Sequence, residues 1–279
     1  MIVGQRVDRY KLEKKLYDGE FTTIFRASHN VLGSRHALKI QNLEVPDEIP
    51  ESLLQEGRIQ SCISHRNVLG VSDALEFQRR IVLVMDYVRW ESLADLLDRV
   101  GVLPLRGALS LFRGVVRGLR AMHIANVVHR DMKPENILLA KEEGRVVPKV
   151  CDFGLAKLLD PDGAPQPRGL SNSFRYLGTP EYMAPEQAQD PGRVDTRADM
   201  FSLGALLYEL VTGTVAFESD KATEAMYKAA KSEYIDPSAL NPEASPELVA
   251  IIVELLQPKA AKRLADCDTL LQRLDSVRG

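Results

Sequence analysis

The stretch VVHRDMKPENILL, residues 127–139, places charged and polar side chains between two aliphatic runs. Asp131 could accept a proton from a hydroxyl group, Lys133 could meet a phosphate, and the amide oxygen of Asn136 could bind Mg²⁺. The alternative interpretation is a solvated polar turn, but this concentration of functional groups is unusual for a structural turn. The pattern therefore favours a loop that brings a hydroxyl group and a phosphate together.

A second carboxylate, Asp152, follows the apolar run VVPKVC and begins the triplet Asp-Phe-Gly. On a short connection after a strand, it could hold a metal ion that bridges phosphates. Alone the triplet is a weak signal, because Asp-Phe-Gly at the end of a strand is often only a turn. Its position after the first motif strengthens the metal-binding interpretation.

The elements before these loops have the patterns of strands and one helix. Short alternating runs joined by turn residues predict three antiparallel strands within residues 10–42. Residues 44–64 follow, with early prolines and apolar residues at helical spacing, and predict a helix. Two more strands are expected within residues 67–77 and 79–88. Together these elements predict a small β-rich lobe of five strands and one helix.

From Ser92 onward the spacing of apolar residues becomes helical. One set recurs every three or four positions, as a buried helical face would: Leu105, Leu109, Phe112, Val116, Leu119 and Met122. The run MFSLGALLYELV, residues 200–211, is apolar on nearly all sides, which predicts a helix at the centre of a domain. A second lobe, mostly helical, is therefore expected.

The composition excludes several classes of partner and site. The 279 residues carry 36 basic and 39 acidic side chains, so nothing indicates a nucleic-acid partner or an anionic membrane surface. No apolar run suits a signal peptide or a membrane span, and we expect no membrane contact from this segment. Cys62, Cys151 and Cys267 are widely spaced, which favours buried thiols in a reducing compartment. We expect a cytoplasmic protein, or the cytosolic domain of a longer membrane-anchored one.

Two further motifs follow in order, GTPEYMAPE at residues 178–186 and DTRADMFSLG at residues 195–204. With them the chain closely resembles the Hanks-type (eukaryotic-like) serine/threonine protein kinases, especially their bacterial branch. The resemblance covers about residues 10–276. It implies an α+β, two-lobed fold with a five-stranded antiparallel N-lobe, one helix in that lobe, and a mainly α-helical C-lobe. A single kinase domain is implied over residues 1–279, with its N-lobe at about 1–85, its hinge at about 86–92 and its C-lobe at about 93–279.

The resemblance implies catalytic roles for the residues of both loops. Asp131 would orient and deprotonate the substrate hydroxyl, and Lys133 would face the transferred phosphoryl group. Lys133, two residues after Asp131, is similar to the Ser/Thr-specific pattern and unlike the tyrosine-specific one. Asn136 and Asp152 would bind the metal ions.

Lys39 in HALKI matches the lysine that holds the α- and β-phosphates of ATP, and Glu56 matches its ion-pair partner. A lysine within an apolar strand also needs a counter-charge on physical grounds, because burial disfavours its charged form. For an isolated pair, two solvated charges would be the simpler interpretation. The resemblance further implies a structural ion pair between Glu186 and Arg263, and a role for Asp199 as an anchor of the catalytic-loop backbone.

The resemblance also implies a nucleotide cleft for ATP with Mg²⁺, or with Mn²⁺ in its place. Backbone groups around Asp86 and Val88 would bond to adenine, with Met85 behind the pocket. An apolar residue in a strand is by default part of the core, so the roles of the cleft walls depend on the resemblance alone. The implied nucleotide contacts are Leu16, Gly19, Ile24, Ala37, Lys39, Asp86, Val88 and Leu138.

The loop that covers the nucleotide departs from the family pattern G-x-G-x-x-G-x-V. Residues 17–24 read YDGEFTTI, so only the middle glycine, Gly19, is kept. Glycine lets backbone N–H groups approach phosphate oxygens without a Cβ in the way. Alternation predicts that Asp18 and Glu20 point away from ATP, so we expect reduced rather than abolished binding. Gln60 stands where relatives have an apolar residue, and we expect it to loosen the alignment of the lobes.

The expected activation segment, between the DFG and APE motifs, contains Ser171 and Ser173. A phosphate on either serine could pair with Arg130 and order the segment. Serines are common in any exposed loop, so the alternative is that neither is regulatory. Thr179 is interpreted as a structural hydroxyl near Lys133.

The sequence thus predicts a protein serine/threonine kinase that transfers the γ-phosphoryl group of ATP to proteins, including itself. Expected partners are protein substrates and a second copy of the chain during trans-autophosphorylation. A pseudokinase or nucleotide-sensing scaffold is an alternative, motivated by the missing glycines and Gln60, and a kinase of small molecules is another. The active enzyme is favoured because all five groups that the chemistry needs are present: Lys39, Glu56, Asp131, Asn136 and Asp152.

Overall fold

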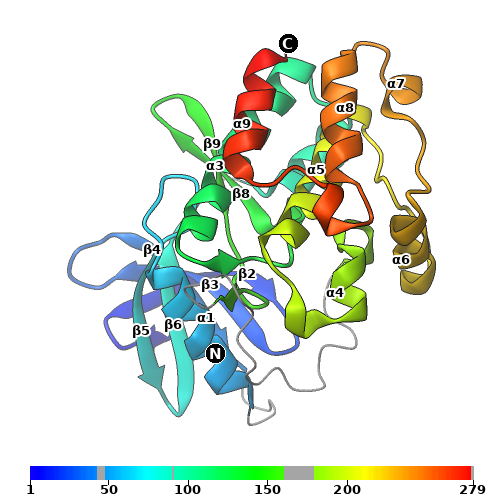
Figure 1. Cartoon of the computed structure of the whole chain (residues 1–279). Coiled ribbons are helices and arrows are strands. Elements are labelled where there is room, and N and C mark those ends of the chain that lie inside the picture. The colour runs from blue at the N-terminus through cyan, green and yellow to red at the C-terminus, as the bar shows by residue number, and fades with distance from the viewer. Residues whose placement is uncertain (43–47, 90, 160–178, 278–279) are drawn as a thin grey trace.

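The computed structural model of the chain describes residues 1–42, 48–89, 91–159 and 179–277. Its N-terminal part is an antiparallel sheet of strand order β1-β2-β3-β4-β6-β5, which we call the sheet lobe together with helix α1 (Glu48–Ser61) (Figure 1). The strands are β1 (Arg6–Val7), β2 (Tyr10–Asp18), β3 (Thr22–His29), β4 (Arg35–Gln41), β5 (Val71–Phe77) and β6 (Arg80–Asp86). All five predicted strands and the helix are present, and the short β1 adds a sixth strand at one edge.

Alternation along the strands gives the sheet two apolar faces. Phe25 and Leu38 are buried in a cluster on one face. Leu83 lies on the other face, in a cluster that also contains Leu53 of α1. Because Lys39 follows Leu38 in β4, its side chain points to the face that α1 covers.

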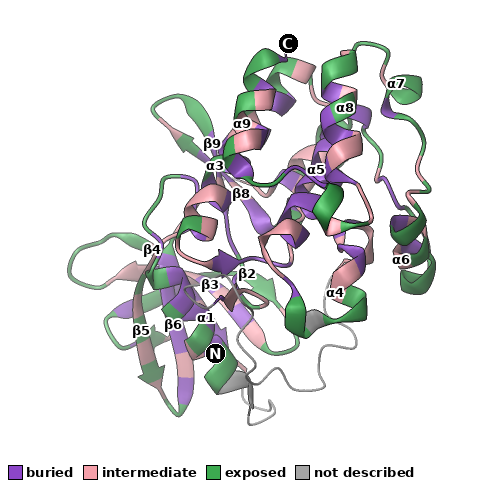
Figure 2. Cartoon of the chain, viewed as in Figure 1, coloured by how far each residue is buried: buried purple, intermediate pink, exposed green. Residues whose placement is uncertain are grey.

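The C-terminal part, which we call the helical lobe, contains the predicted buried helices. Its helices are α2 (Leu93–Val100), α3 (Leu105–Ile124), α4 (Pro185–Gln189), α5 (Thr196–Thr212), α6 (Ala222–Lys231), α7 (Pro237–Leu240), α8 (Pro246–Leu255) and α9 (Cys267–Ser276). Asp195 caps the first turn of α5, and Gly213, with φ 75°, ends it in the left-handed conformation. Figure 2 shows that α5 is buried on nearly all sides, as its apolar pattern predicts.

Two short antiparallel pairs hold the loops that carry the chemistry. Strand β7 (Val127–Val128) pairs with β10 (Lys157–Leu158), and β8 (Ile137–Glu142) pairs with β9 (Arg145–Val150). The loop of residues 129–136 connects β7 to β8, and Asp152 follows β9. The Cys151 N–H donates to the carbonyl oxygen of Asn136 at 2.9 Å. This bond places Asp152 directly beside the loop of residues 129–136, which we call the catalytic loop.

The three cysteines are free thiols. Cys151 and Cys267 are buried as predicted, but the prediction for Cys62 is wrong, because Cys62 follows the last turn of α1 and is exposed to solvent. In the part of the chain that the structure describes, no helix has both the length and the apolar character needed to cross a bilayer.

Candidate active site

Lys39 is the point at which the two lobes meet. Its Nζ lies 2.8 Å from each carboxylate oxygen of Glu56 on α1 and 3.2 Å from Oδ1 of Asp152. The side chains of Lys39 and Glu56 are only 12% and 5% exposed. The expected ion pair between Lys39 and Glu56 is therefore present, and Asp152 joins it from the helical lobe.

The charges of Lys39 and Asp152 stabilise each other. Burial alone would lower the pKa of Lys39, but the carboxylates of Glu56 and Asp152 outweigh it and raise the pKa above its ordinary value. The Lys39 ammonium in turn holds the pKa of Asp152 below its ordinary value. At neutral pH the site therefore presents a fixed cation next to an ionised carboxylate, which suits phosphate and metal binding respectively.

The catalytic-loop residues Asp131, Lys133 and Asn136 come together in the structure. Asn136 Nδ2 donates to the carbonyl oxygen of Asp131 at 2.7 Å and to its Oδ2 at 2.9 Å. Lys133 Nζ lies 3.5 Å from the same carboxylate and donates to Thr179 Oγ1 at 2.8 Å. The expected place of the Thr179 hydroxyl beside Lys133 is confirmed.

Asp199, the predicted anchor of this loop, is fully buried in α5. Its carboxylate accepts hydrogen bonds from the backbone N–H groups of His129 and Arg130 at 2.9 and 2.8 Å, and His123 Nε2 lies 2.8 Å away. Burial alone would raise the pKa of Asp199, but the hydrogen bond with His123 holds it below its ordinary value. Arg130 has φ 71°, an uncommon conformation for a residue other than glycine, and the bond to its N–H supports it.

The oxygen atoms of Asn136 and Asp152 fit the demands of Mg²⁺. Asn136 Nδ2 is directed at Asp131, so Oδ1 points away from it and accepts no hydrogen bond from the described residues. Asp152 Oδ1 accepts from Lys39 and from the N–H of Gly154, which leaves Oδ2 for a metal ion. The described residues contain no cluster of three or more His, Cys, Asp or Glu side chains suited to a metal. Mg²⁺ does not need one, since one or two protein ligands together with substrate phosphates commonly bind it.

The apolar residues implied for adenine lie in one cluster between the lobes. Ala37 and Met85 are buried there, and Ile24, Val88 and Leu138 pack against them. The backbone of Val88 makes no hydrogen bond with the described residues, which leaves its N–H and carbonyl group open to a ligand.

The remaining residues implied for the nucleotide or for regulation lie outside this apolar cluster or outside the described residues. The Asp86 N–H donates to the carbonyl oxygen of Gly70 at 2.9 Å, which fixes the end of β6, where the hinge is expected to begin. Leu16 in β2 is largely exposed and lies outside the adenine-side cluster. Ser171 and Ser173 lie outside the described residues.

The hairpin that carries Gly19 is held by hydrogen bonds from Asn42, which follows β4. Asn42 Nδ2 donates to the carbonyl oxygens of Gly19 and Glu20 at 2.8 and 2.9 Å, and its Oδ1 accepts from Thr23 Oγ1 at 2.8 Å. Its backbone N–H donates to the carbonyl oxygen of Phe21 at 2.9 Å. No sequence motif marks Asn42, because only the pairing of β3 with β4 brings it to the hairpin.

Side chains also pack on the single retained glycine. A Cβ at Gly19 would lie 2.6 Å from Cε1 of Tyr17, so the Tyr17 ring occupies the space that any larger residue would need. Asp18 accepts from Lys15 Nζ at 2.7 Å and from Thr23 Oγ1 at 3.1 Å. Asp18 therefore points to the Thr23 face of the hairpin and away from Ile24, as alternation predicts.

The expectation that Gln60 loosens the alignment of the lobes stays a prediction, but the structure shows how its side chain is placed. It is buried, and its Nε2 donates to the carbonyl oxygen of Leu69 at 2.7 Å. Its Oε1 has no hydrogen-bond partner among the described residues. The amide thus ties α1 to the segment before β5 by a hydrogen bond, although one buried oxygen is left unpaired.

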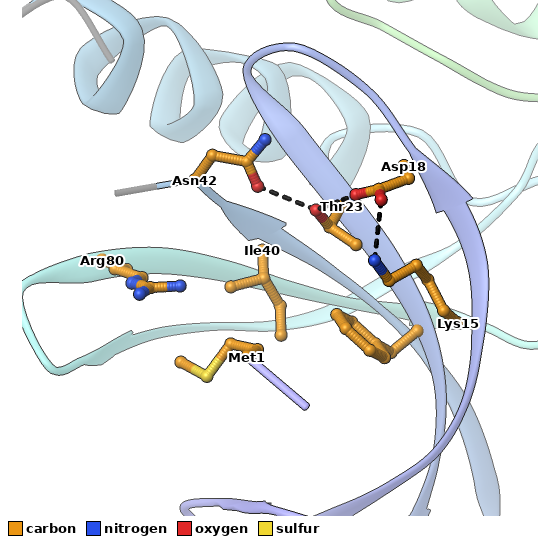
Figure 3. A pocket seen from close by; sticks show the side chains of 8 residues that line it. Met1, Lys15, Asp18, Thr23, Ile40, Asn42 and Arg80 are labelled. Atoms are coloured by element: carbon orange, nitrogen blue, oxygen red, sulfur yellow. Dashed lines mark hydrogen bonds and ion pairs between the residues drawn. The ribbon is translucent and has the colours of Figure 1, made fainter. Parts of the chain in front are cut away.

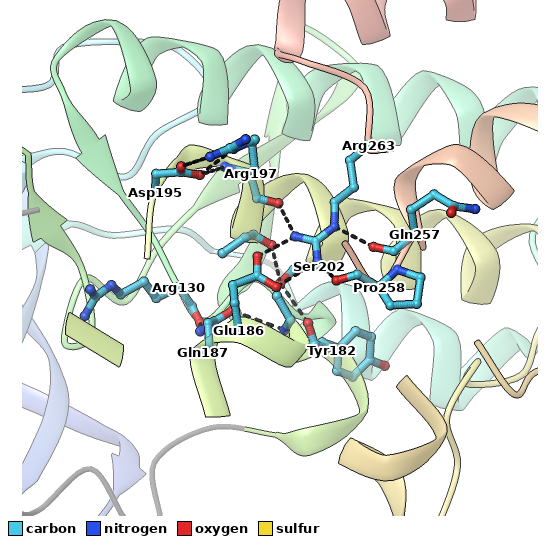
Figure 4. Close-up of polar contacts among 12 residues, drawn as sticks. Arg130, Tyr182, Glu186, Gln187, Asp195, Arg197, Ser202, Gln257, Pro258 and Arg263 are labelled. Carbon is cyan, nitrogen blue, oxygen red and sulfur yellow. Dashed lines mark hydrogen bonds and ion pairs between the residues drawn. The ribbon is translucent and has the colours of Figure 1, made fainter. Parts of the chain in front are cut away.

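Arg263 holds α4 to the end of the helical lobe (Figure 4). Its Nη1 and Nη2 donate to Oε1 and Oε2 of Glu186 at 2.5 and 2.8 Å. Its guanidinium also donates to three backbone carbonyl oxygens and lies 4.9 Å from the ring centre of Phe201. The expected ion pair of Glu186 and Arg263 is present. Gln187, which the sequence analysis missed, donates from Nε2 to the carbonyl oxygen of Arg130 at 2.8 Å and connects α4 to the catalytic loop.

Comparison with known proteins agrees with this geometry. The sequence model of the family described as "Protein kinase domain" matches residues 10–274 of this chain. The serine/threonine-protein kinase pkn2 of Myxococcus xanthus is 31% identical over 259 residues, which cover 91% of this chain and 31% of that protein. Pkn1 of the same organism is 32% identical over 268 residues, which cover 95% of this chain and 37% of that protein.

A third relative is the serine/threonine-protein kinase PknL of Mycobacterium bovis, 30% identical over 271 residues that cover 96% of this chain and 65% of that protein. The chain spans 31% and 37% of the length of the two Myxococcus proteins, so it corresponds to one part of each.

Proposed function

Because this chain belongs to the protein kinase family, we propose that it is an active serine/threonine protein kinase. It transfers the γ-phosphoryl group of ATP to hydroxyl groups of proteins, including its own. The observation that carries the proposal is the position of Lys39, whose Nζ lies 2.8 Å from Glu56 of the sheet lobe and 3.2 Å from Asp152 of the helical lobe. One cation that aligns both lobes is what the binding and orientation of a triphosphate require.

Each polar group of the site has a role in this reaction. Lys39 binds the α- and β-phosphates, and Asn136 and Asp152 hold Mg²⁺, or Mn²⁺ in its place. The metal supplies charge neutralisation on the phosphates. Asp131 takes the proton of the substrate hydroxyl group. The hydroxyl oxygen forms a bond to the γ-phosphorus of ATP, and the bond from that phosphorus to ADP breaks. Lys133 neutralises charge on the transferred group.

We propose that the nucleotide lies in the cleft between the lobes of a single domain of residues 1–279, with the hinge at about 86–92. The hinge bonds to adenine through its backbone, and the remaining contacts come from the cleft walls and the covering hairpin. These residues are Leu16, Gly19, Ile24, Ala37, Asp86, Val88 and Leu138.

Regulation, partners and location are further parts of this proposal. Phosphorylation of Ser171 or Ser173 orders the activation segment through Arg130. Protein substrates and a second copy of the chain, during trans-autophosphorylation, are the partners. A cytoplasmic location is supported by the free thiols of the three cysteines.

Incorporation of radiolabel from γ-labelled ATP tests the function. Asp131→Asn removes the proton acceptor, and Asp220→Asn removes an exposed carboxylate as a matched control. We expect the wild type and Asp220→Asn to incorporate label with Mg²⁺, and Asp131→Asn to be slower by about 100-fold at an unchanged melting temperature. If all three are equally silent while ATP still raises their melting temperatures, the chain is a nucleotide-binding scaffold.

A further inference from the structure

A cavity of about 260 Å³ opens at the end of the sheet lobe, near the base of the Gly19 hairpin (Figure 3). Phe25 and Ile40 line it, and both belong to the sheet face opposite Lys39. The cavity is therefore separate from the proposed nucleotide cleft. Its lining also includes two cationic side chains, Lys15 and Arg80.

Arg80 is the unusual group in this cavity. It is the first residue of β6 and only 8% exposed. Its side chain makes no hydrogen bond or ion pair with the described residues, and its buried Nε has no partner there. In Figure 3 it reaches from β6 toward Ile40. Burial of a cation without a counter-charge is costly, so an anion from outside the chain that paired with Arg80 would be stabilising.

The other lining groups decide which anion fits. Lys15 is already paired with Asp18 at 2.7 Å, so among the lining side chains the one charge left without a partner is that of Arg80. A monoanion would balance this charge, whereas a phosphate dianion would carry an excess negative charge beside Asp18. Met1, Phe25 and Ile40 supply an apolar wall for the uncharged part of the ligand.

We propose that this cavity binds a small organic carboxylate with an apolar group, and that the guanidinium of Arg80 holds the carboxylate. The volume lies just below the usual range of pockets for drug-sized ligands, which suits a single ring or a short alkyl chain.

An occupied cavity would also act on the covering hairpin. Thr23 and Asn42 line the cavity, and Thr23 Oγ1 donates a hydrogen bond to Asn42 Oδ1 at 2.8 Å. Asn42 Nδ2 in turn donates to the carbonyl oxygen of Gly19. A ligand that packs against them stiffens the hairpin and changes the KM for ATP. This effect on KM rests on the proposed function, but binding of the carboxylate does not.

Calorimetric titration without ATP tests the binding separately from catalysis. The probes are benzoate, benzyl alcohol as its uncharged counterpart, and inorganic phosphate. The variants are Arg80→Met and, as a matched control, Arg79→Met, which changes the exposed neighbour in the same turn. We expect saturable benzoate binding to the wild type and Arg79→Met, and at least about 10-fold weaker binding to Arg80→Met or of benzyl alcohol.

Three results would overturn the proposal: no saturable binding of benzoate to the wild type, equal binding to Arg80→Met, or tighter binding of phosphate than of benzoate. Methyl NMR spectra of the wild type keep the test decisive if Arg80→Met does not fold. Benzoate should shift the signals of Ile40 and leave those of Ile235, an exposed residue of the helical lobe, unchanged.

Discussion

The Gly19 hairpin, residues 17–24, and the catalytic loop, residues 129–136, are held in place by opposite means. The backbone of the catalytic loop bonds to Asp199, which is fully buried. The hairpin is held by part-buried and exposed hydrogen bonds from Asn42 to the carbonyl oxygens of Gly19 and Glu20. The ion pair at its edge joins Asp18 and Lys15, whose side chains are 61% and 45% exposed. Buried charged hydrogen bonds are costly to break, whereas exposed ion pairs contribute about 0–1 kcal/mol.

The two loops also differ in how closely they follow the family pattern. In the proposed reaction the catalytic loop places the proton acceptor Asp131, and all of the motif residues of this loop are present. The hairpin, which we propose covers the nucleotide, has Tyr17 and Thr22 in place of two glycines of the family pattern, and hydrogen bonds from Asn42 position it.

The largest effect is expected from Asp199→Asn. The side-chain NH2 group of the asparagine would face one of the two backbone N–H groups that now donate to the carboxylate. We therefore expect the free energy of unfolding to fall by about 3–5 kcal/mol and phosphoryl transfer to be lost. Urea denaturation measures the first effect. Asp195→Asn, in the cap of the same helix, keeps the cap acceptor and should cost less than about 1 kcal/mol. Equal losses in the two variants would mean that Asp199 is not the anchor of the loop.

A somewhat smaller effect is expected from Arg263→Met. The change leaves Glu186 and several carbonyl oxygens without their donor, and we expect a loss of about 3 kcal/mol in the free energy of unfolding. Arg273→Met is the matched control, because Arg273 pairs with Glu254 at 2.9 Å on the surface and should contribute under about 1 kcal/mol. The contrast between buried and exposed anchors is refuted if the control loses as much as Arg263→Met.

Asn42→Ala should have the smallest effect on stability and should act on the nucleotide instead. It removes the bonds to the carbonyl oxygens of Gly19 and Glu20, so we expect a loss of about 1 kcal/mol and a several-fold higher KM for ATP. Steady-state kinetics at varied ATP checks this result. Asn30→Ala, at the exposed tip of the next hairpin, should change neither value. An unchanged KM in Asn42→Ala would show that Asn42 does not position the hairpin.

The sequence predicted the fold class and the groups of the site, because these depend on motifs read in order along the chain. Lys39, Glu56 and Asp131 each stand in such a motif, and the alternation of β4 turns Lys39 toward α1. The family resemblance supplied the distant pair of Glu186 and Arg263, which spacing alone does not reveal.

The missed residues depend on packing between distant segments. Asn42 reaches Gly19 only through the register of β3 and β4. Gln187 reaches Arg130 only when α4 packs against the catalytic loop. The hydrogen bond from Gln60 to the backbone carbonyl oxygen of Leu69 is likewise one that no sequence pattern shows. Arg80 is likewise an ordinary strand residue until the sheet encloses it.

The most direct test of the contrast between the two loops is a measurement of kcat and KM for ATP in the Tyr17→Gly, Thr22→Gly double variant, beside Asp131→Asn. We predict that the restored glycines lower the KM several-fold and leave kcat within about twofold, whereas Asp131→Asn lowers kcat by about 100-fold. A double variant with the wild-type KM and a kcat as low as that of Asp131→Asn would contradict the assignment of nucleotide affinity to the hairpin and of rate to the catalytic loop.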